Sequence, residues 1–394
     1  MGILRLYLAL CVVASHTNRI AFIPMHSGDQ AVQAFFMVSG FYMELVYGKY
    51  PSAGAFYRSR AQRIFFPYWT ILALILVVSL VLGWGFGNWG EITPCLDANQ
   101  RNSPGGAWLA GISNFTVFGQ DAVYFLNAEP GRGLAFTPDF RASGHPLWYL
   151  LVIPQAWSVS VELMFYLLMP LLTRLKSAWL AGGIALSLAA RFLTYSAIGW
   201  SGDPWSYRFL PFELCFFMLG MLACRFWRAN RPGLEKRLGF LSGPRGRSTL
   251  ARAAGVLAVC LTLKAGVATA TRWIGHDNAT LLFNLGWLVL LPPLFTISAS
   301  DRLDREVGEL SYPIYLVHYF LISLLMLALG RPDLTLFCNE LGKSDFPAAT
   351  GTIMAALSIL VSWALNRGLF NRFEEMRHSG LKVKASTKVR AGAL

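Results

Sequence analysis

Long apolar segments alternate with short polar connections along the whole chain. Ten segments, most of them about 18 to 22 residues long, suit a helix that crosses roughly 30 Å of hydrocarbon at 1.5 Å per residue. The pattern therefore predicts an all-α, polytopic transmembrane helix bundle of about ten helices. The predicted helices cover residues 3–22, 31–48, 65–85, 147–172, 178–197, 208–224, 252–270, 279–298, 312–330 and 347–366.

Composition supports a membrane protein. Apolar residues make up 55% of the chain and charged residues only 14%, whereas soluble domains average roughly a quarter charged. The first segment resembles a signal peptide in length, but it lacks a convincing small-residue cleavage site and ends in polar residues from His16 to Arg19. We therefore interpret it as a retained helix.

The net charge of +13 is distributed unevenly between the two sets of connections. With the N-terminus inside, the inner connections and the tail carry 23 of the 34 Lys and Arg residues. This positive-inside pattern predicts that both termini are cytoplasmic, and it explains the basic excess without a nucleic-acid partner. The inner connection 225–252 has eight basic residues against Glu235. Anionic membrane lipids are its expected partner, and a phosphorylated ligand is the alternative.

The domain organisation predicted from the sequence is simple. Residues 1–372 form one transmembrane domain, interrupted by a large outer connection, 86–146, in which we expect short helices around 105–126. The basic tail 373–394 is predicted to be disordered, because most of it lacks an apolar face.

The six cysteines have no close metal-type spacing, so no metal site is predicted. Cys11, Cys215, Cys224 and Cys260 fall in or beside predicted spans and are interpreted as small packing residues. Cys95 and Cys338 fall in connections that face the oxidising side, where a disulfide persists. Sequence alone leaves their pairing open, because it does not supply the required geometry.

Ionisable residues inside the predicted spans are the main functional signal. Each costs at least ~2.5 kcal/mol near the centre of a membrane helix, so each is expected to face a partner or water. We expect Arg208 and Lys264 to extend to an interface, and Arg191 to pair with Glu213. The full set is Arg5, His16, Glu44, Glu162, Arg191, Arg208, Glu213, Lys264 and His318.

Arg5 and His16 are eleven residues apart in the first span. On an α-helix this spacing is about three turns plus 20°, so both side chains share one face about 16 Å apart along the axis. A single histidine in a helix is more often a hydrogen-bonded packing residue than a catalyst. The shared polar face strengthens the catalytic hypothesis for His16 without excluding the packing role.

The second and third spans add a small-residue pair and an arginine cluster. Ser39 and Gly40 permit close approach of helices, which is their simplest role. Arg58, Arg60 and Arg63 precede Pro67, where the third apolar helix is expected to begin. Positive charge there is expected for orientation alone, yet three guanidinium groups within six residues also suit a polyphosphate that arrives from the cytoplasm.

The fourth and ninth spans carry further polar residues. Glu162 lies inside the fourth span, and Ser158 precedes it by four residues on the same helix face. A carboxylate in this position must be paired, protonated or active. In the ninth span Tyr315 and His318 are one turn apart.

Together these segments resemble the acyltransferase 3 family of integral membrane O-acyltransferases over nearly the whole chain. The resemblance rests on Arg5 with His16, Phe35–Phe36 with Ser39–Gly40, Arg60 with Arg63, and Trp157–Ser158 with Glu162, followed by the late segment from Ser311 through Tyr315 to His318. Each motif is weak alone, but five in order are specific. From this resemblance we expect the membrane-only form of the family, without the hydrolase-like C-terminal domain that some relatives carry.

The resemblance implies acyl transfer from acyl-CoA, usually acetyl-CoA, to a hydroxyl of a surface polysaccharide, oligosaccharide or lipid-linked sugar in the bacterial inner membrane. No permanently bound cofactor is expected. His16 is the expected general base, with Glu162 as its orienting group, its electrostatic partner or an acceptor-binding group. Donor phosphates would contact Arg5, Arg58, Arg60 and Arg63. Supporting roles are expected for Ser39, Gly40, Trp157, Ser158, Tyr315 and His318.

Two other interpretations remain open. Ser39 is an alternative carrier of the acyl group, although its helix-packing context favours direct transfer. A secondary transporter would also place Glu, His and Arg inside the membrane, but it is expected to show internal repeats, and none is visible in the sequence.

Overall fold

The computed structural model describes most of the chain. It covers residues 1–17, 20, 21, 23, 25–92, 104–129, 133–238, 249–274, 276–299, 301–330 and 349–373. Cys95 and Cys338 lie outside the described residues, as do residues 374–394 of the tail. Their predicted pairing and disorder therefore stay predictions.

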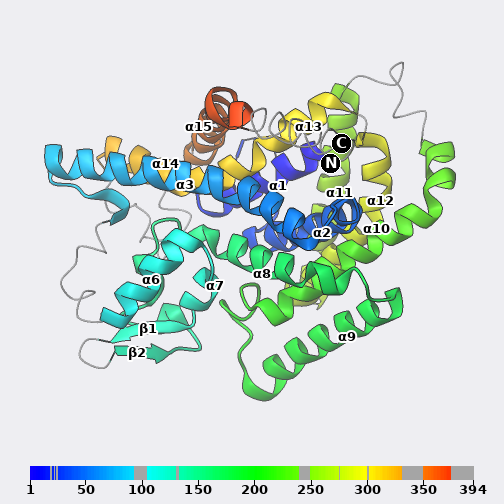
Figure 1. Cartoon of the computed structure of the whole chain (residues 1–394), viewed down its shortest axis with the longest axis horizontal. Helices are drawn as coiled ribbons and strands as arrows, with labels where there is room; N and C mark the ends of the chain where they lie inside the picture. Colours follow the sequence, from blue (N-terminus) through cyan, green and yellow to red (C-terminus); the bar gives the residue numbers. More distant parts are fainter. Residues whose placement is uncertain are drawn as a thin grey trace, which may run out of the picture.

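A helix overlaps each of the ten predicted segments, and the chain is a multi-pass helical membrane protein (Figure 1). Seven helical stretches are long and apolar enough to cross a membrane among the residues described, whereas α1 and the end of α12 are shorter apolar helices. The ten helices are α1 (Gly2–Ser15), α2 (Gly28–Tyr47), α3 (Ala53–Phe86), α8 (Trp157–Leu172), α9 (Ser177–Leu193), α10 (Leu210–Leu238), α11 (Thr249–Ile274), α12 (His276–Ser298), α14 (Ser311–Ala328) and α15 (Thr350–Leu365).

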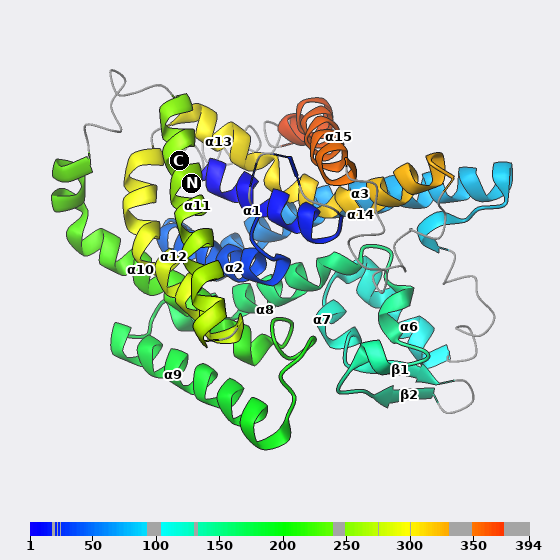
Figure 2. The same ribbon diagram turned by 180° about the vertical axis from the view of Figure 1, so that it is seen from behind.

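The predicted outer connection folds into a small lobe at one side of the helical body (Figures 1 and 2). It contains α6 (Pro104–Thr116) and α7 (Gln120–Val123), which confirm the short helices expected there. The all-α prediction needs one correction, because β1 (Leu126–Glu129) pairs antiparallel with β2 (Gly133–Phe136) in the same lobe. Short helical turns complete the fold: η1 (Gly90–Ile92), η2 (Phe140–Ala142), η3 (Leu147–Leu150), η4 (Pro154–Ala156), η5 (Thr194–Ile198) and η10 (Asn366–Phe370).

Several helix boundaries differ from the hydropathy prediction. The third helix begins at Ala53 instead of near residue 65, so Pro67 lies inside it. The fourth begins at Trp157, ten residues later than predicted, and α10 continues to Leu238. Hydropathy detects residues that favour lipid, whereas helix ends depend on backbone hydrogen bonds and caps. Ser52 supplies such a cap, because its side chain accepts a hydrogen bond from Ala55 N.

α2 and α10 cross with their backbones in close contact. A Cβ atom on Gly40 would lie 2.0 Å from the Phe217 carbonyl oxygen, and one on Gly220 would lie 2.0 Å from the Met37 carbonyl oxygen. Only glycine permits this backbone approach on both helices. The packing role predicted for the Ser39–Gly40 pair is thus confirmed for Gly40. The four cysteines Cys11, Cys215, Cys224 and Cys260 are buried, as predicted for packing residues.

Two arginines of the predicted spans find different partners. Arg191 bonds Glu213 at 2.5 Å and confirms the predicted ion pair. Arg208 does not extend to an interface, so that prediction was wrong. Its guanidinium is buried, bonds both oxygens of Asp203 and lies 4.0 Å from the Tyr124 ring centroid. Carboxylate and aromatic partners offset the loss of water around this charge.

Candidate active site

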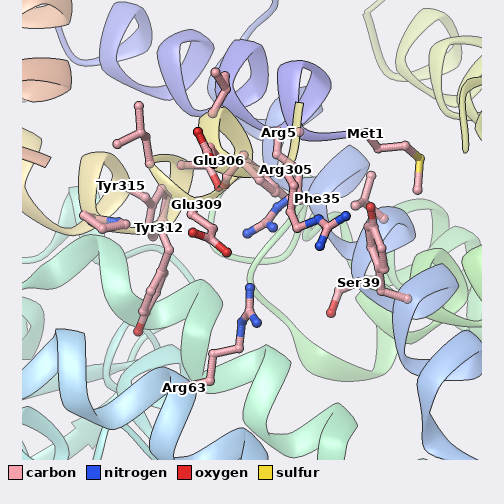
Figure 3. A pocket seen from close by; sticks show the side chains of 18 of the residues that line it. Met1, Arg5, Phe35, Ser39, Arg63, Arg305, Glu306, Glu309, Tyr312 and Tyr315 are labelled. Atoms are coloured by element: carbon pink, nitrogen blue, oxygen red, sulfur yellow. The ribbon is translucent and has the colours of Figure 1, made fainter. Parts of the chain in front are cut away.

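A cavity of about 1380 Å³ opens between helices that are far apart in the sequence. Its walls come from α1, α2, α3, α8, α14, η10 and the short helix α13 (Arg302–Glu309), which occupies a predicted inner connection. Figure 3 shows Arg63 reaching into this cavity from one side, and Arg5, Arg305 and Glu309 from the other. The cavity thus combines cationic, acidic and hydroxyl side chains.

The arginine cluster on α3 divides between two faces of the helix. Arg60 and Arg63 line the cavity, whereas Arg58 is exposed and does not. Arg60 and Arg63 are three residues apart and therefore share a helix face. Arg58 and Arg60 are two residues apart, so their side chains are rotated by about 200° around the helix axis. Arg60 is oriented by a 2.9 Å hydrogen bond from its guanidinium to the Tyr50 hydroxyl. The structure therefore brings Arg5, Arg60 and Arg63 together and leaves Arg58 outside.

Glu162 lies in the cavity wall at the centre of a hydroxyl cluster. One of its carboxylate oxygens accepts hydrogen bonds from the Ser39 hydroxyl and from the Tyr166 hydroxyl, both at 2.5 Å. Charge-assisted hydrogen bonds of this kind are short and roughly twice as strong as neutral ones. Tyr166 was missed in the sequence, although its position four residues after Glu162 places it on the same helix face.

Ser158 and Tyr315 form the next polar layer, one turn along α8 from Glu162. Their hydroxyl groups are 2.7 Å apart, and the Tyr315 hydroxyl also donates to the Gln155 carbonyl oxygen at 2.5 Å. Both side chains line the cavity. Trp157, beside Ser158, is buried with its ring 4.6 Å from the guanidinium of Arg208. This contact fixes the start of α8 against the segment that precedes α10.

His16 and His318 lie beyond this layer and do not line the cavity. Their rings stack with centroids 5.4 Å apart and planes inclined by 28°, and His16 Nδ1 lies 2.7 Å from the Tyr319 hydroxyl. His318 Nδ1 lies 2.8 Å from the Tyr315 carbonyl oxygen. Because a carbonyl only accepts, Nδ1 of His318 carries the proton and Nε2 keeps its lone pair. That Nε2 is buried without a hydrogen-bond partner among the residues described.

The histidine pair and the Glu162 cluster are well separated along the helices. A Cβ atom on Gly28 would lie 2.6 Å from Ser15 Oγ, so the start of α2 is level with the end of α1. Ser39 is eleven residues further along α2, or about 16 Å at 1.5 Å per residue. Glu162 bonds Ser39, whereas His16 contacts Tyr319 and His318. The expected contact between Glu162 and His16 is therefore not formed.

A buried ion pair lies beside the start of α8. Burial alone raises the pKa of the Asp203 carboxyl, but Arg208 and Arg141 outweigh burial and hold this pKa below its usual range. The nearest carboxylate oxygens lie 2.6 Å from Arg208 and 3.0 Å from Arg141. Asp203 therefore stays charged at neutral pH and joins the segment before α10 to the outer lobe.

No group of three or more His, Cys, Asp or Glu side chains is placed to hold a metal ion within the described part of the chain.

Comparison with known proteins adds an independent result. The family model described as an acyltransferase domain, acyltransferase 3, matches residues 1–367. Nodulation protein 10 of Rhizobium leguminosarum bv. viciae is 25% identical over 358 residues, which cover 83% of each chain. No solved structure matches significantly.

Proposed function

The chain belongs to the acyltransferase 3 family and is a membrane acyltransferase that transfers groups other than aminoacyl groups, and from this premise we propose its donor and acceptor. The donor is acetyl-CoA from the cytoplasm. The acceptor is a hydroxyl of a surface polysaccharide, oligosaccharide or lipid-linked sugar, reached from the bacterial inner membrane. Acetyl-CoA is a substrate in this scheme, and no permanently bound cofactor is involved.

One observation supports the proposal most strongly. Arg5, Arg60 and Arg63 line a cavity of about 1380 Å³, and His16 directly follows the end of α1, the helix that contains Arg5, about 16 Å further along its axis. Guanidinium groups bind phosphates through paired hydrogen bonds. The pantetheine arm of acetyl-CoA is a long linear chain, so phosphates held near Arg5 would place the thioester close to His16.

In the proposed reaction the acceptor hydroxyl attacks the thioester carbonyl carbon while His16 removes the hydroxyl proton. The new C–O bond forms as the C–S bond breaks, and the sulfur of CoA leaves as a thiol after taking the proton from His16. General base catalysis of this kind contributes typically 10²- to 10⁴-fold in rate. His318 stacks on His16, and Tyr319 contacts its Nδ1, so both orient the base.

Direct transfer is favoured over an acyl-enzyme on Ser39. The Ser39 hydroxyl donates a hydrogen bond to Glu162, and this pairing resembles an activated nucleophile. Ser39, however, lies about 16 Å from the level of His16, so an acyl group on Ser39 would be out of reach of the proposed base. In the direct mechanism Glu162, Ser39 and Tyr166 shape the cavity near the donor.

Purified full-length protein in lipid nanodiscs, incubated with acetyl-labelled acetyl-CoA and a membrane glycan extract, provides the test. We expect label in the glycan fraction, released by mild base as acetate, and none covalently attached to the protein during turnover. Label that accumulates on the protein and is lost in Ser39→Ala would replace direct transfer with the acyl-enzyme route. Absence of acetyl-CoA binding would contradict the proposed donor.

A further inference from the structure

The connection between α12 and α14, predicted to be an inner one, lies in a position that its sequence did not indicate. Residues 299–311 were expected only to carry orienting charge. Instead, α13 forms a wall of the cavity, and every residue from Asp301 to Glu309 lines it. Arg305 projects from this wall, and Figure 3 shows it beside Arg5 and across the cavity from Arg63.

α13 is anchored to the start of α1. The Asp304 carboxylate accepts hydrogen bonds from the backbone N–H groups of Gly2 at 2.6 Å and Ile3 at 2.9 Å. A Cβ atom on Gly308 would lie 2.6 Å from the Cα atom of Gly2, so the two backbones touch. Arg305 follows Asp304 directly, and Arg5 lies one turn into α1. Both arginines therefore extend into the cavity from one tightly packed corner.

The charges of Arg5, Arg63 and Arg305 converge on one region. All three act electrostatically on the Tyr42 hydroxyl, which also lines the cavity. Neither Arg5 nor Arg305 has a side-chain hydrogen bond or ion pair with another described residue, whereas Arg302 on the same helix bonds Glu306 at 2.8 Å and is 89% exposed. Guanidinium groups such as those of Arg5 and Arg305, which come from separate helices and face one space without carboxylate partners, are typical of an anion site.

The acidic residues of the cavity do not cancel this charge. Asp301 caps α13, Asp304 caps α1, Glu306 bonds Arg302 and Glu162 accepts two hydroxyl groups. Glu309 is the exception among the acids that line the cavity, since no side-chain partner is formed with the described residues. Its carboxylate lies among the three arginines in Figure 3 and would repel an incoming anion.

We propose that Arg305 is a further donor-binding residue, which contacts a nucleotide phosphate of acyl-CoA opposite Arg63, and that Glu309 limits the affinity of the same site. This inference rests on acyl-CoA being the donor. In this proposal α13 completes a phosphate-binding site with arginines on two sides, Arg5 and Arg305 on one side and Arg63 on the other.

Equilibrium binding of acetyl-CoA to full-length protein in nanodiscs of neutral lipid tests the inference. We expect Arg305→Ala to raise the dissociation constant about tenfold, which corresponds to roughly 1.4 kcal/mol. The matched control Arg302→Ala should stay within about twofold, because its side chain, although it also borders the cavity, is 89% exposed and bonds Glu306. Glu309→Gln should lower the dissociation constant severalfold, since it removes a like charge beside the phosphates.

Two further ligands identify the group that Arg305 contacts. If the Arg305→Ala effect disappears with acetyl-dephospho-CoA, the 3′-phosphate is the partner, and if it persists, the diphosphate is. Acetyl-pantetheine, which has neither, should bind wild type and Arg305→Ala equally. Two results would overturn the inference while leaving acetyl-CoA as donor. One is that Arg305→Ala weakens acetyl-pantetheine binding as much as acetyl-CoA binding, and the other is that Arg305→Ala and Arg302→Ala weaken acetyl-CoA binding equally.

Anionic lipid is the other source of phosphate chemistry at this site. Binding is therefore also measured in nanodiscs with anionic lipid. If Arg305→Ala weakens the binding of anionic lipid but not of acetyl-CoA, the assignment of Arg305 to the donor is overturned. If wild type itself fails to bind acetyl-CoA in neutral nanodiscs, the proposed function fails, and this result is distinguishable from an Arg305 variant that binds normally.

Discussion

The arginine-lined cavity and the histidine pair differ in how their polar groups are arranged. The cavity is wide, lined by several arginines, and built from helices that are far apart in the sequence. In the histidine pair, His318 is fully buried with its Nδ1 held by a backbone carbonyl, and His16 is partly buried. In the proposed function, binding and proton transfer are therefore separate tasks, joined by α1, which contains Arg5 and ends directly before His16.

The largest expected effect comes from the histidine pair. His16→Ala should lower the turnover number by roughly 10² to 10⁴ because it removes the proposed base, while the dissociation constant for acetyl-CoA stays within about twofold. Glycan labelling and equilibrium binding on the same sample measure both. His145→Ala, in the outer lobe, is the control. Equal turnover in His16→Ala and wild type would remove His16 from the mechanism.

The support of the outer side is tested next. Asp203→Asn should destabilise the protein by about 3 to 5 kcal/mol, because it leaves the buried Arg208 without its carboxylate. Asp203 has a lowered pKa in the folded protein, so its stabilisation is complete above the unfolded value of about 3.9 and is lost as pH falls through the folded pKa. Thermal unfolding of both proteins should therefore differ at pH 7 and converge in strong acid. A difference independent of pH would contradict the ion-pair explanation.

A smaller effect separates the two faces of α3. Arg63→Ala should raise the KM for acetyl-CoA roughly tenfold or more, with turnover at saturation nearly unchanged, because the lost contact is to a phosphate remote from the reacting carbonyl. Arg58→Ala is the matched control, since Arg58 is exposed outside the cavity. A change in turnover number without a change in KM for Arg63→Ala would assign Arg63 to the chemical step instead.

The smallest effect concerns the frame of the cavity. Gly40→Ala forces a methyl group against the Phe217 carbonyl and should cost about 1 to 3 kcal/mol of stability. Gly48→Ala should be neutral, because nothing lies within 4 Å of the added carbon and the backbone is right-handed helical. Thermal unfolding in detergent compares the two. Equal stability of both variants would mean that the α2–α10 crossing relaxes freely.

Much of the fold was accessible from the sequence because lipid imposes a simple rule. An apolar segment of about 20 residues satisfies its backbone as a helix, so each of the ten segments contains one. Helix ends were less predictable. Pro67 was taken as a start, but it lies inside α3, since a membrane helix tolerates proline where neighbouring groups compensate.

The candidate site was partly predictable for a related reason. Ionisable residues are costly in lipid, so Arg5, His16 and Glu162 stood out in the sequence. The sequence grouped Arg58 with Arg60 and Arg63, and only the structure showed that Arg58 does not line the cavity. Tyr319 had no signal beyond its position beside His318. Arg305 gave no separate signal in the sequence. It is one of the basic residues in the inner connections, and the orientation of the protein in the membrane already explained their charge.

The sequence by itself determined the family, the number of apolar segments and the residues whose charge demands a partner, because these depend on composition and on spacing within single helices. Only the tertiary structure decided the partners. It paired Glu162 with Ser39 and Tyr166 instead of His16, stacked His16 on His318, and brought Arg305 opposite Arg63. Such contacts join helices hundreds of residues apart, and their geometry follows from close approaches such as Gly40 on Phe217 that no local pattern encodes.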